Sequence, residues 1–346
     1  MRSRIWLPSA VLLAASLLPC APLHAQSAPQ ADPNWEKVCD AAKSQPLPPP
    51  VSAGPLTADQ LAHCDETKLY YGYGDPPDYP GALQCGWYQY AHPQHTQGNM
   101  VYGPGVLAML YANGYGVARN FDLAIRFACE NDWAAEAEDT YRIGHLESLK
   151  TNGPGDKPFD LCDDITSGLS DGTCTSIQAA ALDTVRRRRI DALVAALPPA
   201  ARAAFPALQA AESAFEDARI RNEVDLSGTS RAAFQLDEEA KLRDQFLINL
   251  QRCGKGDLPS ATPAQIAALD RKLNEVYQQI QHAPASQWQY VTVNPAGIRA
   301  TEEKWIALRD AWISFARLAL PRLPVSSLQS ELIRLRLHQL HSLLGS

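Results

Sequence analysis

The sequence predicts an all-α protein, with disulfide-stapled α-hairpin repeats in its N-terminal part followed by two tandem three-helix units. Three observations predict this fold. A glycine-containing pattern recurs after 42 residues near the start. Six of the seven cysteines beyond residue 25 lie before residue 175. From residue 176 onward, apolar residues recur at the spacing of one helix face.

The chain begins with the features of a signal peptide. Arg2 and Arg4 form a positive n-region, and the apolar run over residues 5–18 is too short for a stable transmembrane span. We expect cleavage after Ala25, which makes residues 1–25 the signal peptide; a rival cut would make Cys20 a lipoprotein site. The mature protein is then secreted across the inner membrane, with the periplasm as its expected location and no other membrane span.

Residues 26–57 are expected to form a Pro-rich linker. Pro46 and the run Pro48–Pro50 favour extended polyproline geometry and cannot occupy a helix interior. Trp35 and Cys39 are the only anchoring side chains in this stretch.

Composition and charge restrict the class of partner. Hydrophobic residues make up 46% of the chain, which is enough for packed cores. The formal net charge of −7 becomes −9 when residues 1–25, with their two arginines, are removed. Because nucleic-acid binding requires a basic face to neutralise phosphates, the charge argues against nucleic acid as the main partner.

Cysteines in an exported protein are expected to form disulfides. Zinc ligation is not expected, because the sequence has no C-x2-C pair. Cys162 and Cys174 bracket a short Asp/Ser/Gly loop, and we predict that they are bonded. We also predict a bond between Cys64 and Cys85, at inward positions on the two helices of the first repeat. The odd number leaves at least one thiol free or paired between chains, with no partner assigned to Cys39, Cys129 and Cys253.

Residues 58–175 are expected to contain a degenerate helical repeat. Gly72 and Gly114, 42 residues apart, each end a first helix, where glycine supplies the left-handed backbone conformation. Asp78 and Asn120 follow at the same offset and are expected to cap the second helices. The second copy, over Val106–Arg126, resembles the Sel-one-like repeat. This resemblance implies a stack of α-hairpins that serves as a scaffold for protein contacts.

Six helices are expected after residue 176, in two units over residues 176–254 and 262–346. Corresponding residues of the two units, apolar and charged, recur at offsets of 83, 90 and 93 in the first, second and third helices. Prolines and glycines lie between the helical segments and separate them. The expected helices cover about 177–196, 200–224, 230–252, 263–282, 297–319 and 326–343.

The second unit carries a further pattern. Leu273–Tyr277 reads Leu-Asn-Glu-Val-Tyr, and Trp305 is followed by Arg309 and Asp310, then by the helix starting at Glu331. This pattern resembles the LprI-like family of exported helical proteins, some of which are described as lysozyme inhibitors. The first unit resembles it more faintly. The family has a cysteine just after its Arg-Asp pair, and this chain does not.

The resemblance makes Arg309 and Asp310 the candidate partner-binding residues, because it places them on a helix beside Trp305. The residues alone leave two alternatives open. Arg309 and Asp310 form either a structural ion pair or part of a binding face.

Other motifs carry weaker signals. Gly168–Gly172 spells G-x-S-x-G, but a nucleophile elbow needs a preceding strand, so we expect a disulfide-bounded turn. His92 and His95 lack nearby carboxylates and are expected in a solvated loop. The run Arg186–Arg189 cannot share one helix face and is expected to be solvated, with anionic-ligand contact as the alternative. No enzyme, metal or cofactor is expected.

These observations together predict an exported, non-enzymatic protein that binds another protein. The most concrete version is an inhibitor of lysozyme or of a related peptidoglycan hydrolase. A variant is an immunity protein that protects a cell from a secreted wall hydrolase. The alternative is a non-inhibitory envelope scaffold or adaptor built from helical repeats.

Overall fold

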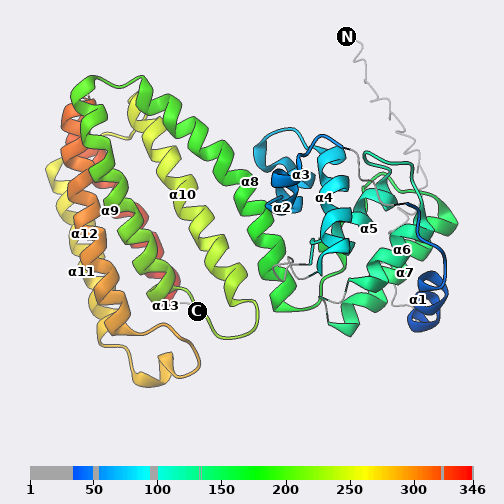
Figure 1. The fold of residues 1–346 in the computed structure, drawn as a ribbon. Helices are drawn as coiled ribbons and strands as arrows, with labels where there is room; N and C mark the ends of the chain where they lie inside the picture. Colours follow the sequence, from blue (N-terminus) through cyan, green and yellow to red (C-terminus); the bar gives the residue numbers. More distant parts are fainter. Residues whose placement is uncertain are drawn as a thin grey trace, which may run out of the picture.

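The computed structural model describes residues 34–49, 54–93, 100–131, 133, 135–320 and 323–344. Over this part of the chain the protein is helical and contains no strand, which confirms the predicted all-α class (Figure 1). The predicted signal peptide, its cleavage site after Ala25, the alternative lipoprotein residue Cys20, and His95 lie outside the described residues.

The helices fall into an N-terminal group of short helices and a C-terminal group of long ones (Figure 1). Short 3-10 helices in the described part of the chain, η1 (Gly72–Gly74), η3 (Leu161–Asp164) and η4 (Ala285–Trp288), lie in the connections between α-helices. The α-helices are α1 (Trp35–Lys43), α2 (Ala58–Ala62), α3 (Glu66–Tyr71), α4 (Tyr79–Ala91), α5 (Pro104–Asn113), α6 (Phe121–Glu130), α7 (Glu136–Asn152), α8 (Gly168–Ala195), α9 (Pro199–Glu223), α10 (Arg231–Lys255), α11 (Pro263–Gln281), α12 (Pro295–Ala319) and α13 (Val325–Leu344).

Two hydrophobic cores organise these helices. The buried members of one lie between residues 39 and 177, and those of the other between residues 201 and 343. Helix α8 belongs to both, since Ile177 is buried in the first core and Ile190 packs against the second. The predicted boundary between residues 175 and 176 therefore falls inside a continuous helix and not in a connector.

The 42-residue repeat corresponds to two helical hairpins, α3–α4 and α5–α6. Gly72 and Gly114 end their first helices with φ of 76° and 71°, and Asp78 and Asn120 cap the second helices with their side chains. Equivalent backbone hydrogen bonds close both hairpins, from Asp78 N–H to Leu69 O at 2.8 Å and from Asn120 N–H to Tyr111 O at 2.9 Å.

Three disulfides cross-link the N-terminal helices, as is typical of proteins from oxidising compartments. Cys162–Cys174 and Cys64–Cys85 are the two bonds predicted from the sequence. Cys64, however, lies in the turn between α2 and α3 and not on a helix. The third bond joins Cys39 to Cys129, and among the described residues Cys253 is the free, buried cysteine.

The prediction of a linker over residues 26–57 is wrong for its middle part. Residues 35–43 form α1, which packs on α6 and α7. The Cys39–Cys129 bond and the apolar contacts of Val38 and Ala42 with the first core hold this helix in place. Cys39 is thus an anchor, as expected, but its partner Cys129 lies 90 residues further along the chain, so the sequence around it did not indicate a packed helix.

The six long helices share one core, so the two predicted three-helix units are not separate bodies. Equivalent helices of the two predicted units nevertheless make equivalent contacts. The first and third helices of each unit pack together, as α8 with α10 and α11 with α13. The second helices, α9 and α12, pack on one another along the centre of the bundle (Figure 1).

Candidate functional site

The predicted contact residues lie on α12. Arg309 donates from Nε and Nη2 to Oδ1 of Asp310 at 3.0 and 2.9 Å. Its guanidinium also lies 5.5 Å from the ring centre of Trp305, which is within cation–π distance. The Asp310 side chain is 61% exposed, whereas Trp305 is buried. The structure thus brings the pair together at the surface, above a core tryptophan.

Beneath this surface a buried ionic cluster joins the two units. Arg336 of α13 donates to Glu302 of α12 at 2.8 Å and to both carboxylate oxygens of Glu223 of α9. Glu223 also accepts from Arg219, which in turn donates to Glu238 of α10 at 2.7 Å. Burial raises the pKa of Glu302, and Arg336 opposes that rise. The cluster therefore links helices α9, α10, α12 and α13.

A cavity of about 420 Å³, here called the end pocket, opens at the end of the bundle. Its walls come from the C-terminal ends of α9 and α13, the first turns of α10, and the segment over residues 287–293. It combines aromatic, aliphatic and acidic side chains. Those used below are Asp225, Phe234, Asp237, Glu238, Trp288 and Leu343.

The end pocket is acidic. Four carboxylates line it, against two cationic side chains, Arg219 and Lys241. Both cations are already engaged: Arg219 binds Glu223 and Glu238, and Lys241 lies 3.9 Å from Glu238. The lining therefore has a net formal charge of −2, from four carboxylates and two cations.

Asp225 and Asp237 carry this excess charge. Donors of Thr292 and Ser227 hold the pKa of Asp225 below its usual range, so this carboxylate stays ionised. Asp237 is exposed and makes no hydrogen bond or ion pair with the described residues. Phe234, one helical turn earlier on α10, has 46% of its surface exposed. The end pocket is thus lined by a carboxylate without a described partner, Asp237, and by an exposed aromatic ring, Phe234.

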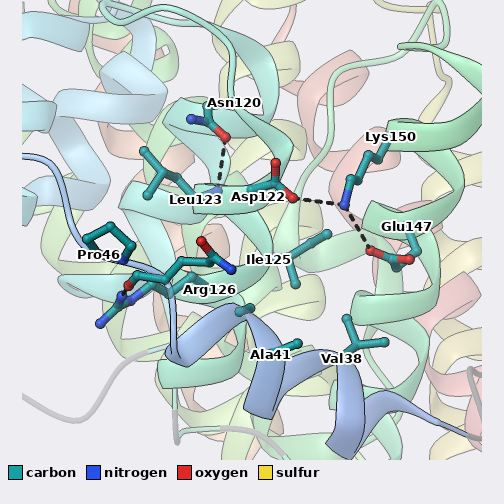
Figure 2. A pocket seen from close by; sticks show the side chains of 12 residues that line it. Val38, Ala41, Pro46, Asn120, Asp122, Leu123, Ile125, Arg126, Glu147 and Lys150 are labelled. Carbon is teal, nitrogen blue, oxygen red and sulfur yellow. Dashed lines mark hydrogen bonds and ion pairs between the residues drawn. The ribbon is translucent and has the colours of Figure 1, made fainter.

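A larger cavity, of about 610 Å³, lies between α1, α6 and α7. Figure 2 shows Lys150 joined to both lining carboxylates, Asp122 and Glu147. Lys150 lies 2.8 Å from Asp122 and 3.8 Å from Glu147, and Arg126 binds Glu130 and the carbonyl of Gln45. We do not favour this cavity as a binding site, because each lining cation and each lining carboxylate is already paired.

A third cavity, of about 390 Å³, lies between α8, α9 and α10. Arg243 binds Glu216 at 2.9 Å and also binds Asp183, and Arg186 binds Asp244. Glu212 lies against the cavity without a hydrogen bond or ion pair to the described residues. Burial, together with the charge of Glu216, raises its pKa to about 8.

The G-x-S-x-G segment is a helix start and not the turn predicted from the sequence. Gly168–Gly172 forms the first turns of α8, and its N-cap Ser167 accepts from the backbone of Ser170. The Ser170 hydroxyl is buried and donates to Glu138 at 2.7 Å. This carboxylate also accepts from the backbone N–H groups of Thr166 and Ser167. Ser170 therefore belongs to a structural hydrogen-bond network at the start of α8.

The remaining sequence candidates are structural as well. His92 stacks on Tyr88 and its Nδ1 lies 2.8 Å from the Tyr88 carbonyl. Arg186 is buried, which corrects the expectation that the whole arginine run is solvated. Arg188 binds Asp75 at 2.7 Å and so connects α8 to the N-terminal helices. Among the described residues, no group of three or more His, Cys, Asp or Glu side chains is placed to hold a metal ion.

No family model, curated protein or solved structure matches this chain. None of the described helices has both the length and the apolar character needed to cross a membrane.

Sequence reasoning missed the end pocket, because its lining comes from four segments between residues 219 and 343. One local signal was present. Phe234 is a large apolar residue on the polar side of α10, where the helix period leaves it outside the core stripe of Leu242 and Phe246.

Proposed function

We propose that this chain is an exported protein that binds and inhibits lysozyme or a related peptidoglycan hydrolase. The observation that carries the proposal is the LprI-like pattern of the second unit, with Arg309 and Asp310 at the surface of α12 beside Trp305. An immunity protein against a secreted wall hydrolase is the same proposal with a particular target.

The charge of the chain supports this class of partner. Removal of residues 1–25 leaves a formal net charge of −9. Animal-type lysozymes are commonly basic, so the acidic protein would be steered toward such an enzyme, and the gain would be mainly in association rate. Affinity would then depend on a few well-packed anchors, among which aromatic and arginine side chains are enriched.

The test is the lytic activity of a basic animal-type lysozyme, and of a wall hydrolase encoded nearby, with the full-length protein at micromolar concentration and low salt. We expect at least one enzyme to be slowed, and Arg309→Ala and Asp310→Ala to weaken inhibition. Glu303→Gln, an exposed charge change on the same helix, is the matched control. If neither enzyme is slowed, the envelope-scaffold alternative takes the place of inhibition.

A further inference from the structure

We infer that the end pocket is the anchor site for the partner, and that it receives one basic side chain, a lysine or an arginine, from that protein. The inference rests on the proposed function for the identity of the partner. The carboxylate and aromatic side chains that line the pocket are the reason for proposing a cationic group.

Charge complementarity is the first argument. The lining has an excess of two carboxylates over cations, and both cations are already paired with Glu223 or Glu238. An anionic ligand would meet unopposed carboxylate charge at Asp225 and Asp237. A cationic group would instead find in Asp237 an acceptor that has no described partner.

The aromatic walls are the second argument. Phe234 and Trp288 line the same cavity as these carboxylates, and Val291, Val293 and Leu343 supply aliphatic surface. Lysine and arginine have long apolar stems that pack on such surfaces while the charged end stays polar. Their cationic ends are also attracted to the faces of aromatic rings. The combination of acid and aromatic surface therefore selects a basic side chain over a purely apolar one.

The Trp288 indole provides an independent observation. Its Nε1–H is buried and has no hydrogen-bond acceptor among the residues that the structure describes. A buried donor without a partner is energetically unfavourable. A ring rotation that gives Nε1–H an acceptor on the incoming backbone would remove the penalty.

The size of the end pocket fits this occupant. Its volume of about 420 Å³ lies at the lower end of ligand-binding cavities, which span about 300–1,000 Å³. It accommodates one long side chain with its flanking backbone.

The direct test uses N-acetyl-L-arginine amide as the probe, with N-acetyl-L-glutamine amide as its uncharged control. Binding to the full-length protein is followed by the NMR signal of the Trp288 indole N–H, assigned with Trp288→Phe. We expect a saturable shift with the arginine probe. Asp237→Asn should weaken probe binding by about two- to fivefold, and the double variant Phe234→Ala/Asp237→Asn by about tenfold.

Asp191→Asn is the matched control, because Asp191 is an exposed carboxylate on α8 outside the pocket lining. It should leave probe binding unchanged. No shift with the arginine probe, an equal shift with the glutamine probe, or equal affinity in the double variant would overturn the inference.

A second arm measures lysozyme binding to the same full-length variants. If the double variant weakens it by about tenfold and Asp191→Asn does not, both proposals are supported. If lysozyme binds the double variant as tightly as the unchanged protein, the end-pocket inference fails and the proposed function stands. If lysozyme does not bind but the arginine probe does, the proposed function fails and the cationic site stands.

Discussion

Arg336 of α13 donates two hydrogen bonds to the carboxylate of Glu223 of α9, at 2.6 and 2.9 Å, and neither side chain is exposed to solvent. The two residues are 113 positions apart in the sequence. Their pairing joins the last helix of the second unit to the middle helix of the first.

Replacing Arg336 with methionine should destabilise the bundle strongly. The change leaves Glu223 with only Arg219 and leaves Glu302 without its cation, in a buried setting. Breaking a buried pair in this way lowers the free energy of unfolding by roughly 3–5 kcal/mol. Urea denaturation followed by circular dichroism at pH 7 measures the change. Arg334→Met, an exposed position on the same helix, should change stability by less than about 0.5 kcal/mol.

Stability should decrease with rising pH because of Glu212. Its folded-state pKa, raised to about 8, exceeds its ordinary value of 4.5, so the folded protein retains a proton that the unfolded chain loses. This contribution to stability is fully present below pH 4.5 and is lost as the pH rises through about 8.

Glu212→Gln should therefore match the unchanged protein at pH 4 and exceed it at pH 9, by roughly 2–4 kcal/mol. Thermal unfolding at both pH values measures this difference. Glu275→Gln, an exposed position on α11, serves as the control. An equal effect of Glu212→Gln at both pH values would rule out the titration.

Cys253 should be unreactive in the folded protein. Burial raises the pKa of its thiol to about 12, so the reactive thiolate is scarce at neutral pH. Iodoacetamide followed by mass spectrometry should label no thiol in the native mature chain. After unfolding without reductant it should label one, since the other described cysteines are bonded. Rapid labelling of the native protein would contradict this burial.

The double variant Cys39→Ser/Cys129→Ser should release α1. The bond closes a long loop, with a sequence separation of 90, and its loss lowers stability by roughly 2–5 kcal/mol. Hydrogen exchange measured by mass spectrometry should show faster exchange in α1 and α6. Exchange in α12 should be unchanged, because that helix belongs to the other core. Equal acceleration in both places would indicate that the two cores unfold together.

Five of the six long helices were predictable to within a few residues, whereas α8 begins nine residues before its expected start. Leu273, Val276 and Ile280 of α11 show why, since a single apolar stripe at helical spacing both forms and buries that helix. The sequence of Ser167 and the glycines after it predicted a turn. In the structure these residues begin α8, and Glu138 of α7 accepts hydrogen bonds from Ser167 and Ser170 there. Such contacts between distant segments leave no periodic trace in the sequence.

The site was predictable only in part. The pattern around Trp305 placed Arg309 and Asp310 on one helix and left open whether they form an ion pair or part of a binding face; the structure shows the ion pair, with Asp310 exposed. The buried partners of Arg336 and the lining of the end pocket result from how the two units pack. No local rule brings Asp237 and Trp288 to the same cavity.

Helix α8 has a mechanical consequence. Its 28 residues give a length of about 42 Å, and beyond Gly172 it contains neither glycine nor proline. Because one end is buried in the first core and the other packs against the second, it acts as a strut that sets the spacing of the two halves. A protein held on the hairpin stack and another held at the bundle would be kept at a defined separation. Fluorescent labels placed on the two halves should therefore report one narrow distance distribution.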